Sequence, residues 1–260
     1  MDENYQTYLN RAIRMILPET YQSQVQHIQE SPKFRRQAEQ HYDAVPFPGY
    51  SIVTPPGIDE TDNLELYKSL ADLQQQLLHR IGGQSFIPVP ADSFHVTVAD
   101  LIWNDAFRDA NQSPDYESKL RSTIAKIFQE CQPLRTGQPI RFQVLGLLLM
   151  TRAIGVCLAP TDEDSYDRIL KVRRALYQNH ELMGLGIEQQ YYFTPHVTLG
   201  YFGEIPPADA RQSLSQVFID LNQQWLDKEP QDFWVRRAEL RKFADMTRYD
   251  RESDWAVFEF

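Results

Sequence analysis

Along the chain, segments whose apolar residues recur with the period of a helix alternate with segments that have the pattern of a strand. Leucines recur at helical spacing over residues 64–81, and Gly82 and Gly83 then end the segment. Helical spacing returns over 116–131, 162–183 and 208–226. Short β-branched or apolar runs predict strands at 50–54, 86–98, 140–150, 153–158, 191–201, 233–243 and 255–260. This order predicts an α+β fold with mainly antiparallel pairing.

The first 44 residues have a different, glutamine-rich pattern. A short helical stripe ends at Pro18, and residues 31–41 form a second, charged stretch of helical character. The stripe consists of Leu9, Ile13, Ile16 and Leu17. The sequence Val-Pro-Phe-Pro-Gly at 45–49 cannot continue a helix and marks the clearest boundary. We therefore expect residues 1–44 to be a helical leader packed on a single main domain of residues 45–260.

Acidic side chains outnumber basic ones. The chain has 36 acidic and 26 basic residues and a formal net charge of −10. A net negative field repels long polyanions, so the balance is unlike that of a protein that coats nucleic acid. The charge still permits a small phosphodiester or nucleotide, or an RNA end, held by a few local cations. Plain solubility is the simpler interpretation of the same charge.

The two cysteines and the N-terminus bear on the compartment. Cys131 and Cys157 stand far apart, which argues against a disulfide framework and against a cysteine zinc site. The N-terminus lacks a basic region followed by an apolar one, and no apolar run approaches the ~20 residues that span a bilayer. We expect a cytoplasmic, monomeric protein without a membrane partner.

Two motifs repeat the sequence His-Val-Thr in matching surroundings. They read Phe-His-Val-Thr-Val at 94–98 and Pro-His-Val-Thr-Leu at 195–199. Side chains alternate along a strand, so each histidine shares one face with its threonine while the flanking apolar residues share the other. Six histidines and twelve threonines predict roughly 0.3 His-x-Thr triplets by chance, and two are present. The pair predicts a site built by a duplicated unit with pseudo-twofold symmetry.

The two motifs, their spacing and the order of elements around them resemble the 2H phosphoesterase superfamily, which includes the 2′-5′ RNA ligase-like proteins and the RNA cyclic phosphodiesterases. The segments Ile-Pro-Val-Pro-Ala-Asp-Ser-Phe-His at 87–95 and Thr-Leu-Gly-Tyr at 198–201 look closest to a bacterial branch. The resemblance covers residues 45–260. It implies two pseudo-symmetric lobes with mainly antiparallel sheets around a central cleft and helices outside. The leader departs from the family's minimal domain.

The chemistry suits these residues independently of the resemblance. Hydrolysis of a cyclic phosphodiester takes a proton from the attacking water and gives one to the departing ribose oxygen. Two imidazoles with pKa values of about 6.5 can divide these tasks near neutral pH. The hydroxyls of Thr97 and Thr198 can donate to non-bridging phosphate oxygens. The resemblance assigns His196 as the base for water and His95 as the acid.

Further residues are candidates for substrate binding. Arg152 at a hairpin tip and Arg241 near the last strands are candidate phosphate cations, with a solvated strand face as the simpler role. Tyr50 and Tyr249 are candidates for stacking on a base, as is Trp103, for which core packing is the default. The same C-terminal region offers Arg236, Arg237 and Lys242 as additional cations.

Several other chemistries lack their motifs. The chain has neither His-Glu-x-x-His nor Cys-x-x-Cys, and neither motif strand carries a carboxylate beside its imidazole. A phosphate-binding glycine loop and a Gly-x-Ser-x-Gly elbow are also missing. We expect a cyclic phosphodiesterase without metal or cofactor, acting on a 2′,3′-cyclic phosphate, a 2′-5′ linkage or a related cyclic nucleotide. Two alternatives stay open: a non-catalytic module that binds RNA or a nucleotide on the same fold, and 2′-5′ RNA ligation.

Overall fold

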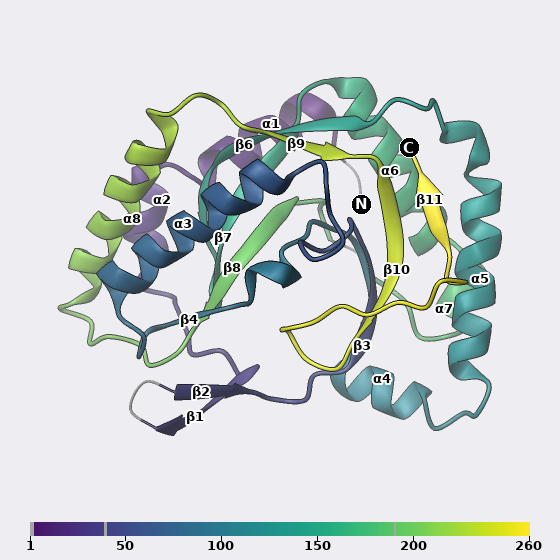
Figure 1. Cartoon of the computed structure of the whole chain (residues 1–260), viewed down its shortest axis with the longest axis horizontal. Helices are drawn as coiled ribbons and strands as arrows, with labels where there is room; N and C mark the ends of the chain where they lie inside the picture. Colours follow the sequence, from purple (N-terminus) through teal and green to yellow (C-terminus); the bar gives the residue numbers. More distant parts are fainter. Residues whose placement is uncertain (1–2, 39–40, 190) are drawn as a thin grey trace.

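The computed structural model describes residues 3–38, 41–189 and 191–260, and its strands form two main antiparallel sheets and one small hairpin (Figure 1). The four-stranded sheet has the order β11 (Val257–Glu259), β10 (Arg237–Phe243), β3 (Gly49–Val53) and β5 (Thr97–Trp103). The five-stranded sheet has the order β4 (Phe86–Pro88), β8 (His196–Phe202), β7 (Ala153–Pro160), β6 (Ile140–Leu149) and β9 (Asp232–Val235). The hairpin pairs β1 (Phe34–Ala38) with β2 (His41–Ala44). The predicted α+β class with antiparallel sheets is confirmed.

Helices cover the outer faces of both sheets (Figure 1). Two of them, which we call the exchanged helices, each follow a strand of one sheet and pack on a strand of the other. Helix α3 (Leu64–Ile81) follows β3 of one sheet but packs on β4 and β8 of the other. Helix α6 (Glu163–Tyr177) follows β7 of the five-stranded sheet and packs on β5 of the other sheet as well as on β7. Helix α8 (Arg211–Leu226) packs against α3, and α5 (Tyr116–Glu130) packs against α6. The shorter helices are α4 (Asn104–Ala110), α7 (His180–Met183), η1 (Ala91–Ser93) and η2 (Gln132–Leu134).

The two sheets follow the same plan. Counted from the strand that follows the exchanged helix, one sheet runs β5-β3-β10-β11 and the other runs β8-β7-β6-β9, with β4 added at its edge. All these neighbours are antiparallel. The unit strand–helix–strand therefore occurs twice, as β3-α3-β5 and as β7-α6-β8, and each copy ends at a histidine motif.

The chain passes directly from one sheet to the other between β9 and β10. The sequence predicted one strand over 233–243, and that prediction was wrong, because Arg236 separates two strands of different sheets. The carbonyl of Arg236 accepts a hydrogen bond from the Phe260 amide at 2.8 Å, and its Nε contacts a carboxylate oxygen of Asp62 at 2.5 Å. Both sheets are therefore joined through one fixed residue.

The N-terminal segment is only partly helical. Helices α1 (Tyr5–Arg14) and α2 (Pro18–Gln24) are present, but residues 31–41 are not a helix, since β1 and β2 occupy this region apart from residues 39–40, which lie outside the described chain. The extended form is held by distant partners, because the Ser31 amide donates to the Phe202 carbonyl at 2.9 Å. The charge pattern that suggested a helix is that of a solvent-facing hairpin.

The predicted apolar stripe of the N-terminal segment is buried only in part, because Leu9 and Ile16 pack against the core but the other two residues do not. Ile13 is 46% exposed and Leu17 39% exposed, whereas Tyr8 and Tyr21 are fully buried. The Tyr8 hydroxyl donates to the Leu158 carbonyl at 3.1 Å, and the Tyr21 hydroxyl donates to the Leu147 carbonyl at 2.6 Å. Tyrosine can occupy this interface because its ring packs while its hydroxyl satisfies a strand carbonyl.

Elsewhere the boundaries differ by short segments. The predicted helix over 162–183 is divided into α6 and α7, and Asp162 caps α6 by accepting from the Ser165 amide at 2.8 Å. Strand β8 begins at His196, so residues 191–195 precede it without regular structure, and residue 190 is not described. No helix in the described residues combines the length and the apolar character needed to cross a membrane.

Candidate active site

Both histidine motifs line one cavity of about 320 Å³ where the two sheets meet. The Val96–Val197 backbone bridge joins the motifs in antiparallel fashion. Val96 and Val197 are fully buried, while the histidines and threonines on either side are partly exposed to the cavity. The predicted alternation of faces is confirmed for both motifs, although His95 lies just before β5 and not within it. The structure thus places around one cavity the four residues that the sequence predicted to be catalytic.

Each imidazole is oriented by the same local contact. The Nδ1 of His95 lies 2.7 Å from the Ser93 carbonyl, and the Nδ1 of His196 lies 2.8 Å from the Thr194 carbonyl. A carbonyl only accepts, so Nδ1 carries the proton and donates, which leaves Nε2 as the free nitrogen of the neutral ring. Neither Nε2 has a hydrogen-bond partner among the described residues. The matched geometry makes both rings available for proton transfer.

The strands diverge from strict alternation at the same place in both motifs. Val98 of β5 and Leu199 of β8 have no partner in the register, so each strand bulges at the third residue after its histidine. The bulge turns the fifth residue after the histidine toward the cavity. Asp100 occupies that position in the first motif and Tyr201 in the second, and both line the cavity.

Burial controls the charge of the two rings. It lowers the pKa of His95 to about 4 and also lowers the pKa of His196, because a charged imidazole loses solvation in the cavity. The backbone carbonyls and Asp100 oppose this change, since negative charge favours the protonated ring. Asp100 is held in turn by the Tyr191 hydroxyl at 2.6 Å and the Ser51 hydroxyl at 3.2 Å.

The two threonine hydroxyls have no hydrogen-bond partner in the described part of the chain. Thr97 and Thr198 are each two residues beyond a histidine and point to the same cavity. A partly buried hydroxyl without an internal partner is free to donate to a ligand. The site therefore offers two proton-transfer groups and two neutral donors around one space.

Two of the four predicted substrate-binding residues face this space or adjoin it. Tyr249, between β10 and β11, lines the cavity with its ring centroid 4.2 Å from that of His95. Arg152 lines an adjoining cavity that also contains His196 and Thr198, and it contacts Gln29 at 2.9 Å. Trp103 lines both cavities and also packs against the core, as the default predicted.

The other two are placed elsewhere. Tyr50 is fully buried, and its hydroxyl donates to Glu117 at 2.8 Å, so it is a core residue and not a stacking surface. Arg241 is 4% exposed and is paired with the carboxylates of Glu239 and Asp59. Because a buried charge of this kind is already neutralised, Arg241 is not available to a phosphate.

The remaining C-terminal cations are paired as well. Their carboxylate partners are Asp62 for Arg236, Glu239 for Arg237 and Glu117 for Lys242. The cavity has instead one lysine or arginine side chain from the described residues, Lys33, which sequence reasoning missed. Asp100 was missed too as a lining residue, because the bulge that exposes it is invisible to a period-two pattern. No group of three or more His, Cys, Asp and Glu side chains in the described residues is arranged to hold a metal ion.

Comparison with known proteins supports the fold. The structure is similar to that of a conserved protein of unknown function, ATU0111, from Agrobacterium tumefaciens, with a TM-score of 0.56 and 12% identity over 87% of this chain and 93% of that one. At this identity the likeness establishes a shared fold alone. No protein-family model matches the chain, and no curated protein does.

Two weaker likenesses are to Usb1 of Kluyveromyces marxianus with uridine monophosphate and to LigT of E. coli complexed with 3′-AMP. Usb1 has a TM-score of 0.45 and 12% identity, covering 82% of this chain and 98% of that one. LigT has a TM-score of 0.41 and 16% identity, covering 82% of this chain and 97% of that one. Both scores are too low to support a statement about this chain.

Proposed function

We propose that this protein is a member of the 2H phosphoesterase superfamily that hydrolyses a cyclic phosphodiester, such as a 2′,3′-cyclic phosphate, by two-histidine general acid–base catalysis. The observation that carries the proposal is the matched pair of imidazoles. Each has Nδ1 fixed by the carbonyl two residues earlier, and each stands beside a threonine hydroxyl without an internal partner. A module that only binds a nucleotide needs no second, identically oriented imidazole.

In the proposed reaction, the neutral Nε2 of His196 accepts a proton from water as the water oxygen attacks phosphorus. The bond between phosphorus and one ribose oxygen breaks, and the protonated Nε2 of His95 donates its proton to that departing oxygen. The products are a phosphomonoester and a free ribose hydroxyl. Thr97 and Thr198 donate to the two non-bridging oxygens, whose negative charge grows in the transition state. The resemblance alone distinguishes the acid from the base, because the local geometry of the two rings is alike.

The substrate of this proposal is small. Both imidazoles line a cavity of about 320 Å³, which suits one phosphate group, and the adjoining cavity that reaches Trp103 and Arg152 gives room for a nucleoside. Both thiols are unpaired and buried, which suits the cytoplasmic location that we propose.

The experiment is turnover of a panel of cyclic phosphates followed by phosphorus NMR. The panel contains the four nucleoside 2′,3′-cyclic phosphates, a 3′,5′-cyclic nucleotide and a 2′-5′ dinucleotide. We expect conversion of at least one to a phosphomonoester by the wild-type protein and by His79→Ala, which alters an exposed histidine on α3. Conversion should be lost in His95→Ala and in His196→Ala. Saturable binding of the panel without turnover would instead identify a non-catalytic binding module.

A further inference from the structure

The N-terminal segment places a lysine in the cavity. Lys33 precedes β1, and its carbonyl accepts from the Val45 amide at 2.9 Å, which fixes the backbone at this point. Its Nζ lies 4.7 Å from the ring centroid of Phe47 and 5.1 Å from that of Tyr201. It also lies 3.2 Å from the sulfur of Met246, a weak acceptor. Its surroundings are therefore two aromatic faces and a thioether.

Lys33 has no carboxylate within ion-pair distance among the described residues. This separates it from the four C-terminal candidate cations, Arg236, Arg237, Arg241 and Lys242, which are all paired with carboxylates. Burial lowers the pKa of Lys33 to about 8, and Asp100 opposes the change, so the amine is still mainly protonated at neutral pH. An unpaired ammonium held in a partly buried cavity is costly unless an anion joins it.

The ammonium lies on the side of the second motif. Lys33 lines the main cavity and the adjoining one, and His196 and Thr198 are also shared by both. We propose that Lys33 binds a non-bridging oxygen of the substrate phosphate beside His196 and Thr198, which makes the N-terminal segment part of the active site. The proposal deepens the phosphoesterase function and rests on it for the identity of the anion.

The test measures binding of inorganic phosphate, so that it does not depend on turnover. Calorimetry compares wild-type protein with Lys33→Met, Lys33→Arg and a control, Lys68→Met, whose lysine is exposed on α3. We expect Lys33→Met to weaken phosphate binding by roughly ten- to a hundredfold, the range for a hydrogen bond to a charged group. Lys33→Arg should recover most of the affinity, and Lys68→Met should match wild type.

Equal phosphate affinity in wild type and folded Lys33→Met would overturn the proposal, with the fold checked by thermal melting. If Lys33→Met does not fold, Lys33→Gln is the second variant, because it removes the charge and keeps a polar side chain. Equal phosphate affinity in wild type and folded Lys33→Gln would overturn the proposal equally. Phosphate binding through Lys33 combined with no turnover of any cyclic phosphate would refute the proposed function and leave the binding site standing.

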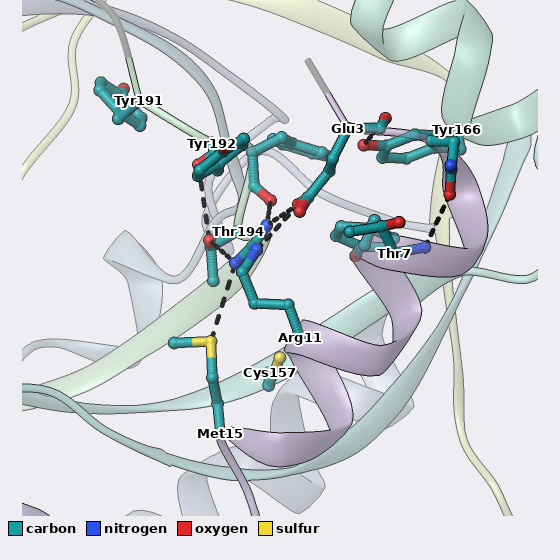
Figure 2. A network of polar contacts seen from close by, with 12 residues as sticks. Glu3, Thr7, Arg11, Met15, Cys157, Tyr166, Tyr191, Tyr192 and Thr194 are labelled. Atoms are coloured by element: carbon teal, nitrogen blue, oxygen red, sulfur yellow. Dashed lines mark hydrogen bonds and ion pairs between the residues drawn. The ribbon is translucent and has the colours of Figure 1, made fainter. Parts of the chain in front are cut away.

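A second, independent observation concerns the stretch that precedes His196. Figure 2 shows Arg11 between Glu3 and Thr194. Arg11 of α1 donates to the Phe193 carbonyl at 2.7 Å and to the Thr194 hydroxyl at 2.8 Å. Glu3 holds the guanidinium from the other side, with its Oε1 2.8 Å from Nε. Thr194 is the residue whose carbonyl orients His196. Arg11 therefore braces the irregular stretch that aims the second imidazole.

The stretch before the first imidazole is held by backbone contacts, because the amides of residues 57 and 58 donate to the carbonyls of residues 94 and 92 at 2.9 and 3.0 Å. Ser93 lies in η1, where its amide and its hydroxyl both bond to the Pro90 carbonyl, at 2.9 and 2.7 Å. The carbonyl that orients His95 is thus fixed by a turn and by backbone bonds, whereas the stretch that orients His196 is also held by a side chain from a helix at the start of the chain. We infer that Arg11 is a positioning residue for His196.

Histidine NMR and steady-state kinetics test this role together. The variants are Arg11→Met, the charge-conserving Arg11→Lys and a control, Arg14→Met, whose arginine is exposed on the same helix. In Arg11→Met we expect the ring signals and pKa of His196 to move while those of His95 stay, and kcat to fall about tenfold through misplacement of the base. The KM should change little, and Arg14→Met should match wild type. An unmoved His196 in Arg11→Met, or equal shifts at both histidines, would overturn the inference.

Discussion

The two halves of the site have nearly the same backbone but different neighbours. In each half a carbonyl two residues before the histidine holds Nδ1, and a bulge three residues after it turns the fifth residue into the cavity. The side chains around the rings differ. His95 stands against the ring of Tyr249, whereas His196 stands on the side of Lys33.

The differing neighbours come from outside the repeated unit. Tyr249 lies in the connection between β10 and β11, and Lys33 lies in the N-terminal segment. A repeat supplies two equivalent imidazoles, yet acid–base catalysis of hydrolysis needs one ring protonated and the other neutral. The non-repeated segments supply the asymmetry that can separate the two roles.

The largest expected effect removes either ring. His95→Ala and His196→Ala should each lower kcat by ~10²-fold or more, because each deletes one proton transfer. The double variant should be little worse than either single one, since the two groups act as a unit. Steady-state kinetics on a substrate turned over by the wild type measures this. A single variant with near wild-type kcat contradicts the equivalence of the two halves.

Replacing either hydroxyl should have a smaller effect. Thr97→Val and Thr198→Val should each lower kcat/KM by roughly 10- to 100-fold, the value of a hydrogen bond to a charged group. The isosteric valine keeps the strand and the packing of the motif. Thr123→Val, at a buried position of α5 outside the cavity, is the control. If only one threonine matters, the phosphate lies closer to that half.

The pH profile should be displaced to acid. The pKa of both rings lies below the ordinary value of about 6.5, and the state that holds one proton on the pair is most populated between the two apparent values. The kcat/KM of the free enzyme should therefore peak below pH 6.5 and fall as pH rises through the upper value. Asp100 raises both pKa values, so Asp100→Asn should move the peak further to acid. Asp72→Asn, an exposed change on α3, should leave the peak where it is.

The length of the substrate should matter little. A chain of net charge −10 is poorly suited to neutralise many phosphates, and the cavity has one lysine or arginine among its described residues. KM for a mononucleotide 2′,3′-cyclic phosphate should therefore resemble that for a long RNA with the same end, with a salt slope equivalent to about one or two phosphate contacts. A much lower KM for the long RNA, with a steep salt slope, would mean that the RNA also binds to a surface outside the two halves of the site.

Chelation should have the smallest effect. The reaction proposed here uses two imidazoles in place of a metal-bound water, so kcat should be unchanged in EDTA. Assays before and after dialysis against chelator measure this. Loss of activity that zinc or manganese restores would replace the acid–base scheme.

The sequence predicted the parts of the site that depend on local pattern. The faces of His95 and His196 follow from strand alternation, and the helix over 64–81 follows from its leucines and the glycines after it. Asp100 could not be found in this way, because the bulge at Val98 depends on pairing with β3. Alternation would have put Ala99 in its place.

The N-terminal region shows a second limit. Its anchoring residues are Tyr8 and Tyr21, which reach strand carbonyls more than a hundred residues away along the chain. A search for aliphatic stripes selects Leu9, Ile13, Ile16 and Leu17 instead, and half of these are exposed. In the sequence, Lys33 is indistinguishable from a surface lysine. Its place at the cavity depends on the backbone hydrogen bond between Ser31 and Phe202. Long-range packing decided these positions.

The single-residue crossing at Arg236 bears on how the molecule loses its structure. A hinge needs a few residues whose backbone angles can change, whereas Arg236 is held on one side by Phe260 and on the other by Asp62. Strand β9 is an edge strand of its sheet and β10 is an inner strand of the other, so neither can separate from the crossing without disrupting its own sheet. Together with the exchanged helices α3 and α6, this ties both halves into one cooperative unit. Calorimetry should give a single transition whose van't Hoff and calorimetric enthalpies agree, and neither half should fold when expressed alone.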